Sequence, residues 1–265
     1  MSVLMKGATG PELLRAYEHA CQLAPDRVEA WVGWARSMYE FADFAASDAI
    51  LSDFVGRHPE NATGFLERAG LRRKAKRTDK AWSDVNEAIR LAPENGDAWA
   101  LKGDLCIDLA TFQDAFNSFQ KAKQYLPDSP WPVMGLYHSA IELKDLPAAE
   151  ASARELRQRF PEQIEGRFYL GEVLLESATD DTRVTSAVKE LEEAETLLTR
   201  EPLDNELVPM LKLLLGRAYY AQKNYTKAKS YLEASVKITP DNADAMFFLG
   251  RTYRALGEKK KRKRC

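Results

Sequence analysis

The chain has 265 residues, of which 45% are hydrophobic and 29% are charged, with a formal net charge of −2. This length allows one or two globular domains with a large buried core, and the composition excludes a disordered chain. A net charge so close to zero gives no electrostatic argument for nucleic acid as a partner, so we expect none. No stretch approaches the ~18 uninterrupted apolar residues of a membrane-spanning helix, so we expect no membrane span.

The positive charge is concentrated at one end of the chain. The segment KKKRKR at 259–264 carries six positive charges, so removing it from the total of −2 leaves −8 for the other residues. A block of like charge is typical of a disordered end, of a nuclear-import-like signal or of a contact with an anionic surface, and these readings stay open. The body of the chain is therefore acidic and its tail is basic.

The start of the sequence and the cysteines indicate the cellular compartment of the protein. The first residues, MSVLMKGATGPELL, contain neither an apolar segment nor the cleavage pattern of a signal peptide. The three cysteines, Cys21, Cys106 and Cys265, are far apart and lack CxxC spacing, which predicts no disulfide framework and no zinc site. We therefore expect a cytoplasmic location, or a nuclear one if the basic tail acts as an import signal.

Taken in chain order, helical runs end at prolines that lie 34 residues apart. The prolines in phase are Pro25, Pro59, Pro93, Pro127 and Pro161. Each is followed by an acid, as is Pro240 farther along the chain. Proline cannot continue a helix, because it lacks the N–H and its ring clashes with the preceding turn, and an acid just beyond it favours the N-terminus of the next helix. The pattern predicts a repeated unit of two helices.

The spacing of these units predicts a single domain over 1–265. In chain order we expect a partial repeat at 1–27, repeats at 28–61, 62–95, 96–129 and 130–163, an irregular repeat at 164–208, a repeat at 209–242, a partial repeat at 243–258 and the basic tail at 259–265. In the unit 96–129, small residues occupy the eighth, twentieth and twenty-seventh positions, with a bulky residue at the twenty-fourth: Gly103, Ala115, Ala122 and Phe119. Small side chains let two helices approach closely and bulky ones fill the gap, so each hairpin must stack on its neighbours.

One region departs from the regular spacing. Between Pro161 and Pro240, 79 residues hold two units plus 11, which we assign to a longer turn at ESATDDTRVTS, a lengthened following helix and the segment EPLDNELV. The excess is either a longer loop, which costs little, or a changed stacking angle or a partner-contacting loop. The ends are also incomplete, since 1–27 supplies only a second helix and GEKKKRKRC has no apolar face.

This pattern resembles the tetratricopeptide repeat, and the segment LLLGRAYYAQKNYTKAKSYLEASVKITPDN at 213–242 is similar to its consensus. The resemblance spans essentially the whole chain. It implies an all-α fold, a right-handed superhelical solenoid of stacked antiparallel helix pairs. Against the family pattern, Tyr137 replaces the small eighth residue, and three cations stand where apolar residues are usual: Arg68, Arg72 and Lys102.

No string of residues in the sequence predicts catalysis. Walker A, GxGxxG, GxSxG and HExxH are absent. The histidines are His19, His58 and His138, and His19, two residues from Cys21, does not share a helical face with it. We therefore expect no catalytic, cofactor-binding or metal-binding residues and no enzymatic activity.

The resemblance also implies a concave groove lined by the first helix of each hairpin, through its second, fifth, ninth, twelfth and thirteenth residues. The peptide-binding residues implied in this sequence are Arg73, Lys74, Asp97, Asp104, Asp108, Trp131, Met134, His138, Glu142, Phe168, Glu172, Arg217, Tyr220, Phe247 and Arg251. The middle of this stripe is acidic with aromatic and Met positions, which favours a basic or aromatic peptide; alternatively, the charges only keep the surface solvated. None of the fifth positions is Lys, so we expect no chaperone-type carboxylate clamp.

The function that the resemblance implies is a non-catalytic interaction scaffold or adaptor, with a partner protein or peptide in the groove. Two alternatives stay open at this point. One is the regulatory or substrate-selecting repeat region of a larger enzyme. The other is a structural protein that self-associates through its incomplete end repeats.

Overall fold

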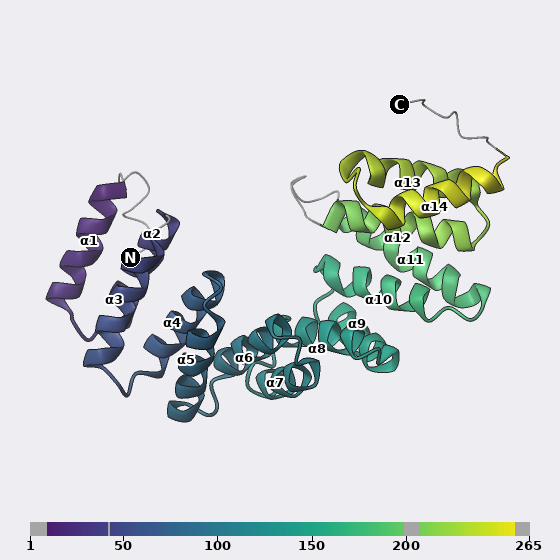
Figure 1. Cartoon of the computed structure of the whole chain (residues 1–265). Coiled ribbons are helices and arrows are strands. Elements are labelled where there is room, and N and C mark those ends of the chain that lie inside the picture. The colour runs from purple at the N-terminus through teal and green to yellow at the C-terminus, as the bar shows by residue number, and fades with distance from the viewer. Residues whose placement is uncertain (1–9, 42, 199–206, 258–265) are drawn as a thin grey trace. The chain divides into compact units, whose positions relative to one another are not determined.

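A computed structural model gives the fold of the chain and describes residues 10–41, 43–198 and 207–257 (Figure 1). These residues form fourteen α-helices and no strand. They divide into two compact units, the first reaching Gly135 and the second beginning at Leu136. The first unit holds α1 (Gly10–Leu23), α2 (Val28–Glu40), α3 (Phe44–Arg57), α4 (Ala62–Lys74), α5 (Thr78–Leu91), α6 (Gly96–Asp108) and α7 (Phe112–Tyr125). After α8 (Trp131–Glu142), which crosses the boundary, the second unit holds α9 (Leu146–Arg159), α10 (Ile164–Glu176), α11 (Asp181–Leu198), α12 (Leu207–Ala221), α13 (Tyr225–Ile238) and α14 (Ala243–Ala255).

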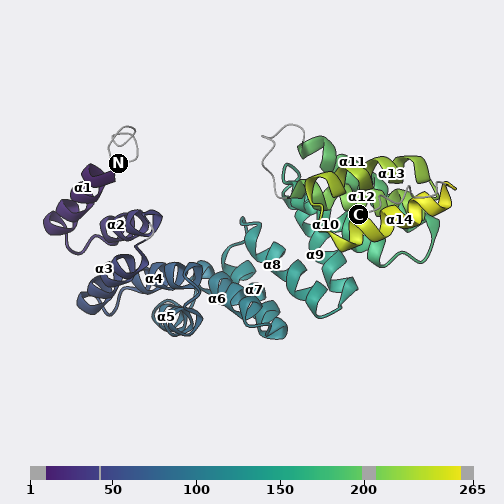
Figure 2. The ribbon, with the colours of Figure 1, turned by 45° about the horizontal axis from the view of Figure 1, so that its top comes forward.

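Within the first unit, helices pair as hairpins that follow one another in chain order. α2 packs on α3, α4 on α5 and α6 on α7, and the second helix of a pair also contacts the first helix of the next pair. α2 also contacts α4, and α4 contacts α6, so these first helices lie in a row (Figures 1 and 2). The second unit repeats the arrangement with α10–α11 and α12–α13, and α14 packs on α12 and α13. The single domain over 1–265 stays a prediction.

Asparagine side chains start several of the first helices. Asn61, Asn95 and Asn242 each follow a proline–acid pair and accept a hydrogen bond from the N–H three residues on. For Asn61, the distance from Oδ1 to Gly64 N is 2.9 Å. This cap satisfies one of the donors that a helix N-terminus leaves unpaired. Proline thus ends one helix, and the asparagine two residues later caps the next.

The turn inside most hairpins contains a residue with positive φ. These residues are Lys76, Ala110, Lys144 and Lys223, with φ between 56° and 62°. Each is the fifteenth residue of its unit. After Lys76, the N–H of Arg77 donates to the carbonyl of Arg72 at 2.8 Å, the hydrogen bond that closes a helix C-terminus ending in a left-handed residue. The turn reverses the chain, so the second helix packs antiparallel to the first.

The small residues predicted at the helix contacts are buried there. Ala115 and Ala122 on α7 are 0% exposed, and Phe119 is 1% exposed. A Cβ placed on Gly103 of α6 would lie 2.7 Å from Phe119 Cζ, closer than packed side chains approach. The Phe119 ring therefore fills the space that Gly103 leaves, and the predicted hairpin contact is confirmed.

The irregular region contains the longest of the described helices. α11 has 18 residues, whereas α9 and α13 have 14 each, so the lengthened helix expected there is present. Most of the segment EPLDNELV lies outside the described residues, in the gap 199–206. The basic tail at 259–265, with Cys265, also lies outside them.

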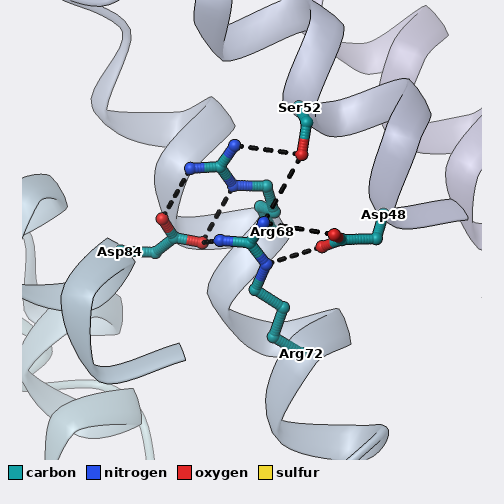
Figure 3. A network of polar contacts seen from close by, with 5 residues as sticks. All are labelled: Asp48, Ser52, Arg68, Arg72 and Asp84. Atoms are coloured by element: carbon teal, nitrogen blue, oxygen red, sulfur yellow. Dashed lines mark hydrogen bonds and ion pairs between the residues drawn. The ribbon is translucent and has the colours of Figure 1, made fainter. Parts of the chain in front are cut away.

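Arg68 and Arg72, two of the departures from the repeat pattern, are held in a buried ion-pair network (Figure 3). Both lie on α4, and each donates to Asp84 of α5 at 2.7 Å. Arg72 also donates to Asp48 of α3 at 2.5 Å, and Ser52 Oγ of α3 accepts from both arginines. Asp84 is only 3% exposed. The network therefore joins three helices through charge-assisted hydrogen bonds.

The cations of this network shift the pKa of Asp48. Burial alone would raise this pKa above its ordinary value of 3.8, but the hydrogen bonds and charge of Arg72, and the charge of Arg68, outweigh burial and lower it. Because the folded state binds the proton less tightly than the unfolded chain, the Asp48 carboxylate stabilises the fold at neutral pH. That contribution is lost as the pH falls through the lowered pKa.

Lys102, the third cation at an apolar position, is stabilised by neighbouring side chains instead. Its Nζ donates to Asn86 Oδ1 at 3.0 Å. The same ammonium group lies 5.3 Å from the ring centroid of Trp82 and 5.5 Å from that of Trp99. Cation–π contacts of this kind compensate part of the cost of removing the charge from water.

Candidate functional site

A groove in the first unit crosses the row of first helices, and we call it the α4–α6 groove. Its volume is about 520 Å³. It is lined by Arg36 of α2, by Leu66, Glu67, Gly70, Arg73 and Lys74 of α4, by Asp97, Leu101 and Asp104 of α6, and by Trp131 of α8. Five of the fifteen predicted binding residues are among them: Arg73, Lys74, Asp97, Asp104 and Trp131.

The apolar part of the groove is formed by Leu66, Leu101 and Trp131. Leu66 and Gly70 lie one helical turn apart on the same face of α4. A Cβ placed on Gly70 would meet no atom within 4 Å. The groove is therefore open over Gly70, because this position carries no side chain to fill it.

Two arginines of the groove are held by carboxylates of the next first helix. Arg73 of α4 donates to Asp104 at 2.7 Å and to Asp108 at 2.6 Å, both on α6. Arg36 of α2 donates to Glu67 of α4 at 2.6 Å. These pairs compensate the acidic charge predicted for this part of the stripe, so Asp104 and Asp108 are already occupied by a cation.

Lys74 and Asp97 are the charges of the groove that remain available to a ligand. Both are exposed, and within the described ranges neither has an ion-pair partner. Lys74 lies in the last turn of α4 and Asp97 in the first turn of α6. The helix dipoles favour a cation and an anion at these two ends, respectively.

The protonation of Asp104 reflects competing influences on its carboxyl group. Burial raises the pKa of Asp104 above its ordinary value of 3.8, while the charge of Arg73 and a hydrogen bond from Trp131 act to lower it. For Arg73, burial acts to lower the pKa, but hydrogen bonding to Asp108 and the charges of both carboxylates raise it. The Arg73–Asp104 ion pair thus lies in a partly buried place beside the groove, where Asp104 also interacts with Trp131.

In the second unit, His138 and Glu172 belong to a cluster around two stacked tyrosines. The ring centroids of Tyr137 on α8 and Tyr169 on α10 are 4.2 Å apart. Tyr137 OH donates to Glu172 Oε2 at 2.7 Å, and His138 Nε2 lies 3.0 Å from Tyr169 OH. Desolvation lowers the pKa of His138, with the charge of Glu142 acting in the opposite direction. The cluster therefore links α8 to α10 through both stacking and hydrogen bonds.

Replacing Glu172 with glutamine is expected to flatten the pH dependence of stability. Burial raises the pKa of Glu172 above its ordinary value of 4.5. The folded state therefore holds this proton more tightly than the unfolded chain, and the stability that the carboxyl group contributes in acid is lost as the pH rises through the folded-state pKa. Glutamine keeps an acceptor for the Tyr137 hydroxyl without the buried charge, so we expect a gain on the order of 1 kcal/mol at neutral pH and none in acid.

Urea unfolding across the acidic to neutral range measures this difference. Glu142→Gln is the matched control, because Glu142 is exposed on α8. A wild-type-like pH dependence in Glu172→Gln would contradict the assignment of a raised pKa to this carboxyl group.

Three other predicted residues lie near this cluster or the unit boundary. Phe168 is 3% exposed and packs edge-on to Tyr169, with centroids 5.7 Å apart, so it offers little surface to a ligand. Glu142 is exposed and has no ion-pair partner in the part of the chain described. Met134 is half-buried on α8 and is not among the residues that line the α4–α6 groove.

The last predicted residues form an arginine–aromatic surface on α12 and α14. Arg251 lies over the rings of Tyr220 and Phe247, at 5.0 and 5.7 Å from their centroids. Phe247 is 58% exposed. Arg217 pairs with Glu176 of α10. This surface belongs to the second unit, so it is a separate group from the residues of the α4–α6 groove.

Sequence reasoning missed several residues of these sites. Leu66, Leu101 and Gly70 shape the α4–α6 groove but were not among the predicted residues. Leu66 occupies a fifth position, which is a groove position in the family pattern, so a signal for it was present. Tyr137 had a signal too, as a bulky residue at a small eighth position, whereas nothing in the sequence pattern singles out its stacking partner Tyr169.

The described residues show no arrangement typical of a metal site or a membrane span. Among them, no group of three or more His, Cys, Asp or Glu side chains is placed to hold a metal ion. None of the described helices has the length and apolar character needed to cross a bilayer. The expected absence of catalytic and cofactor-binding residues, and the cytoplasmic or nuclear location, stay predictions.

Comparison with known proteins shows which family the repeated hairpin is similar to. Residues 213–261 match the tetratricopeptide repeat family model, and 204 residues are 25% identical to tetratricopeptide repeat protein 37 of Xenopus laevis. Residues 213–261 therefore carry the tetratricopeptide repeat pattern. The match with the Xenopus protein covers 75% of this chain but only 13% of that relative, so the chain spans a small part of its length.

Solved structures share the fold over most of this chain. The Cut9–Hcn1 hetero-tetramer of the APC/C matches with a TM-score of 0.70 at 16% identity, covering 94% of this chain and 47% of that one. PilF of Pseudomonas aeruginosa matches with a TM-score of 0.71 at 13% identity, covering 89% and 99%. YrrB, a tetratricopeptide repeat protein with an unusual peptide-binding site, matches with a TM-score of 0.58 at 17% identity, covering 74% and 96%. The predicted fold class, an all-α solenoid of stacked antiparallel helix pairs, is confirmed.

Proposed function

We propose that this tetratricopeptide repeat chain is a non-catalytic interaction scaffold that binds a segment of a partner protein in the α4–α6 groove. The observation that carries the proposal is an apolar wall that lies in one groove with two unpaired charges of opposite sign, Lys74 and Asp97. The peptide-binding site of YrrB, which has the same fold, supports a protein segment as the ligand. Grooves that combine apolar pockets with a few placed charges recognise peptides by anchoring one side chain and selecting its neighbours.

The chemistry of the groove defines the segment that it accepts. Leu66, Leu101 and Trp131 receive one apolar side chain, whose full burial contributes about 1.5–3 kcal/mol. Lys74 attracts a carboxylate of the ligand, and Asp97 attracts a lysine or arginine. We therefore propose a ligand segment in which an apolar residue has an acid on one side and a base on the other.

For the second unit, we propose a preference for basic side chains, as its acidic residues indicate. Glu142 and Glu172 have no ion-pair partner among the described residues, whereas Asp104 and Asp108 of the first unit are occupied by Arg73. Selection of a basic partner therefore rests on Glu142 and Glu172 more than on the paired aspartates.

Replacing Gly70 with leucine is expected to abolish binding in the α4–α6 groove. The leucine side chain would fill the groove, and because a Cβ at this position meets no atom within 4 Å, α4 need not move. Leucine also favours a helix over glycine by roughly 0.8–1 kcal/mol, so the fold is retained. Peptides selected from a random library on the wild-type chain, and measured by fluorescence anisotropy, are expected to bind the variant at least roughly tenfold more weakly.

Gly56→Leu provides the matched control for this experiment. Gly56 lies on α3, does not line the groove, and also has no atom within 4 Å of a Cβ. This variant is expected to bind the selected peptides as the wild-type chain does, and Lys74→Glu is expected to lose the preference for an acid in the ligand. Equal affinity of Gly70→Leu and wild type for the selected peptides would rule out the groove as the binding site.

A further inference from the structure

The contact between neighbouring repeats in the first unit is made by one ring held between two glycines. Phe119 of α7 lies against Gly103 of its own hairpin and against Gly135 of the following helix α8. A Cβ would lie 2.7 Å from Phe119 Cζ if placed on Gly103, and 2.5 Å from Phe119 Cδ1 if placed on Gly135. Neither position therefore tolerates a side chain. Gly103 is the eighth residue of its unit and Gly135 the sixth of the next.

The same contact recurs at other glycines in the eighth position. A Cβ on Gly171 of α10 would lie 2.5 Å from Leu191 of α11, and a Cβ on Gly216 of α12 would lie 2.5 Å from Leu232 of α13. In the three hairpins with Gly103, Gly171 and Gly216, the second helix thus places a bulky side chain against the eighth-position glycine of the first helix.

Gly250 of α14 is an eighth-position glycine that no described side chain covers. A Cβ placed on it would meet no atom within 4 Å. On the same helix, Met246 is 47% and Phe247 58% exposed, whereas Leu213, the counterpart of Phe247 on α12, is 3% exposed.

α1 carries the other component of this contact, the bulky side chain of a second helix. Tyr17 lies against Gly33, the sixth residue of the next unit, as Phe119 lies against Gly135. Within the described residues, no eighth-position glycine lies on the other side of Tyr17, and the residue is half-buried. Among the described residues, α1 therefore takes the place of a second helix with no first helix before it, and α14 that of a first helix with no second helix after it.

We propose that α1 of one molecule packs on α14 of a second copy, with Tyr17 inserted against Gly250. Tyr17 and Gly250 would then make the same contact that Phe119 and Gly103 make inside the first unit. The helices also carry formal charges of opposite sign, since α1 has two glutamates and one arginine, whereas α14 has two arginines and one aspartate. Because the two surfaces differ, the interface is heterologous, and each copy uses α1 toward one neighbour and α14 toward another.

Sedimentation velocity over a concentration series tests this self-association. The wild-type chain is expected to increase in mass with concentration, past twice its monomer mass of 29.9 kDa. Gly250→Leu is expected to stay monomeric, because the new side chain fills the space for Tyr17, and no described atom lies within 4 Å of a Cβ at this position. Tyr17→Ala is expected to stay monomeric as well.

Mixing the two variants distinguishes this interface from any other. Gly250→Leu still supplies Tyr17, and Tyr17→Ala still supplies Gly250, so the mixture is expected to form a dimer and nothing larger. Gly56→Leu, another leucine in open space on a helix, is expected to associate like the wild type. Far-UV circular dichroism verifies that each variant is folded.

A wild-type chain that is monomeric at the highest concentration, a Gly250→Leu variant that associates like the wild type, or a variant mixture that stays monomeric would each overturn the proposal. The α4–α6 groove is not part of this interface, so Gly250→Leu is expected to bind the selected peptides unchanged. Failure of self-association and failure of the proposed peptide binding are therefore separate results.

Discussion

Replacing Asp84 with alanine is expected to lower the free energy of unfolding by about 3–5 kcal/mol. Asp84 is 3% exposed and accepts hydrogen bonds from Arg68 and Arg72 at 2.7 Å each (Figure 3). Without this carboxylate, Arg68 keeps only the hydroxyl of Ser52 as a partner in the network, and Arg72 keeps Asp48 and Ser52. A cation left buried with no counter-charge costs far more than the ion pair itself contributes.

Asp53→Ala is the control for Asp84→Ala. Asp53 pairs with Arg57 at 2.8 Å one helical turn away, but both side chains are about half exposed. Solvent-exposed pairs of this kind contribute only ~0–1 kcal/mol. Urea unfolding followed by tryptophan fluorescence measures both variants. If Asp84→Ala were no more destabilising than Asp53→Ala, the buried network would not join the three helices as described.

Phe119→Ala is expected to cost about 3–5 kcal/mol of stability, the range for a buried phenylalanine. The ring is 1% exposed, and it fills the space beside two residues without side chains, Gly103 and Gly135. Glycines have no side chain that can rearrange into the resulting cavity, so the gap stays open and the stacking of α6, α7 and α8 is weakened.

Phe247→Ala serves as the comparison for Phe119→Ala, because the same atoms are removed from a side chain that is 58% exposed. We expect its effect on the unfolding free energy to stay below about 1 kcal/mol. Thermal and urea unfolding report both variants. Equal losses in the two variants would show that the contact of Phe119 with the two glycines does not determine repeat stacking.

The hairpins were predictable from the sequence because the signals that start, end and reverse helices act over a few residues. Prolines 34 residues apart mark the helix ends, and the small residues Ala115 and Ala122 mark the contact face. The spacing predicted that small residues such as Gly103 face a neighbouring helix and that bulky residues such as Phe119 fill the gap, and the buried ring against Gly103 confirms this. The asparagine caps and the left-handed turn residues also recur at fixed positions of the repeat, although only the structure shows that they cap helices and reverse the chain.

The sequence indicated which residues lie on the first helices, but not which of them come together or pair. Arg73, Asp97 and Asp104 line one groove, and their role in binding a ligand stays a prediction. The pairing of Arg73 with Asp104 and Asp108 was not predicted. Sequence position shows which face of a helix a residue occupies, but the rotamer and the distance to the neighbouring helix decide what it binds.

The sequence by itself determined that the chain consists of paired helices with small residues where they touch, because steric and hydrogen-bonding rules at proline, asparagine and alanine are local. Only the tertiary structure decided which charges are paired and which are free. Asp84 lies 16 residues from Arg68, and Asp108 lies 35 residues from Arg73. The energy of such pairs depends on their separation in space and their burial, both of which exist only after the hairpins have stacked.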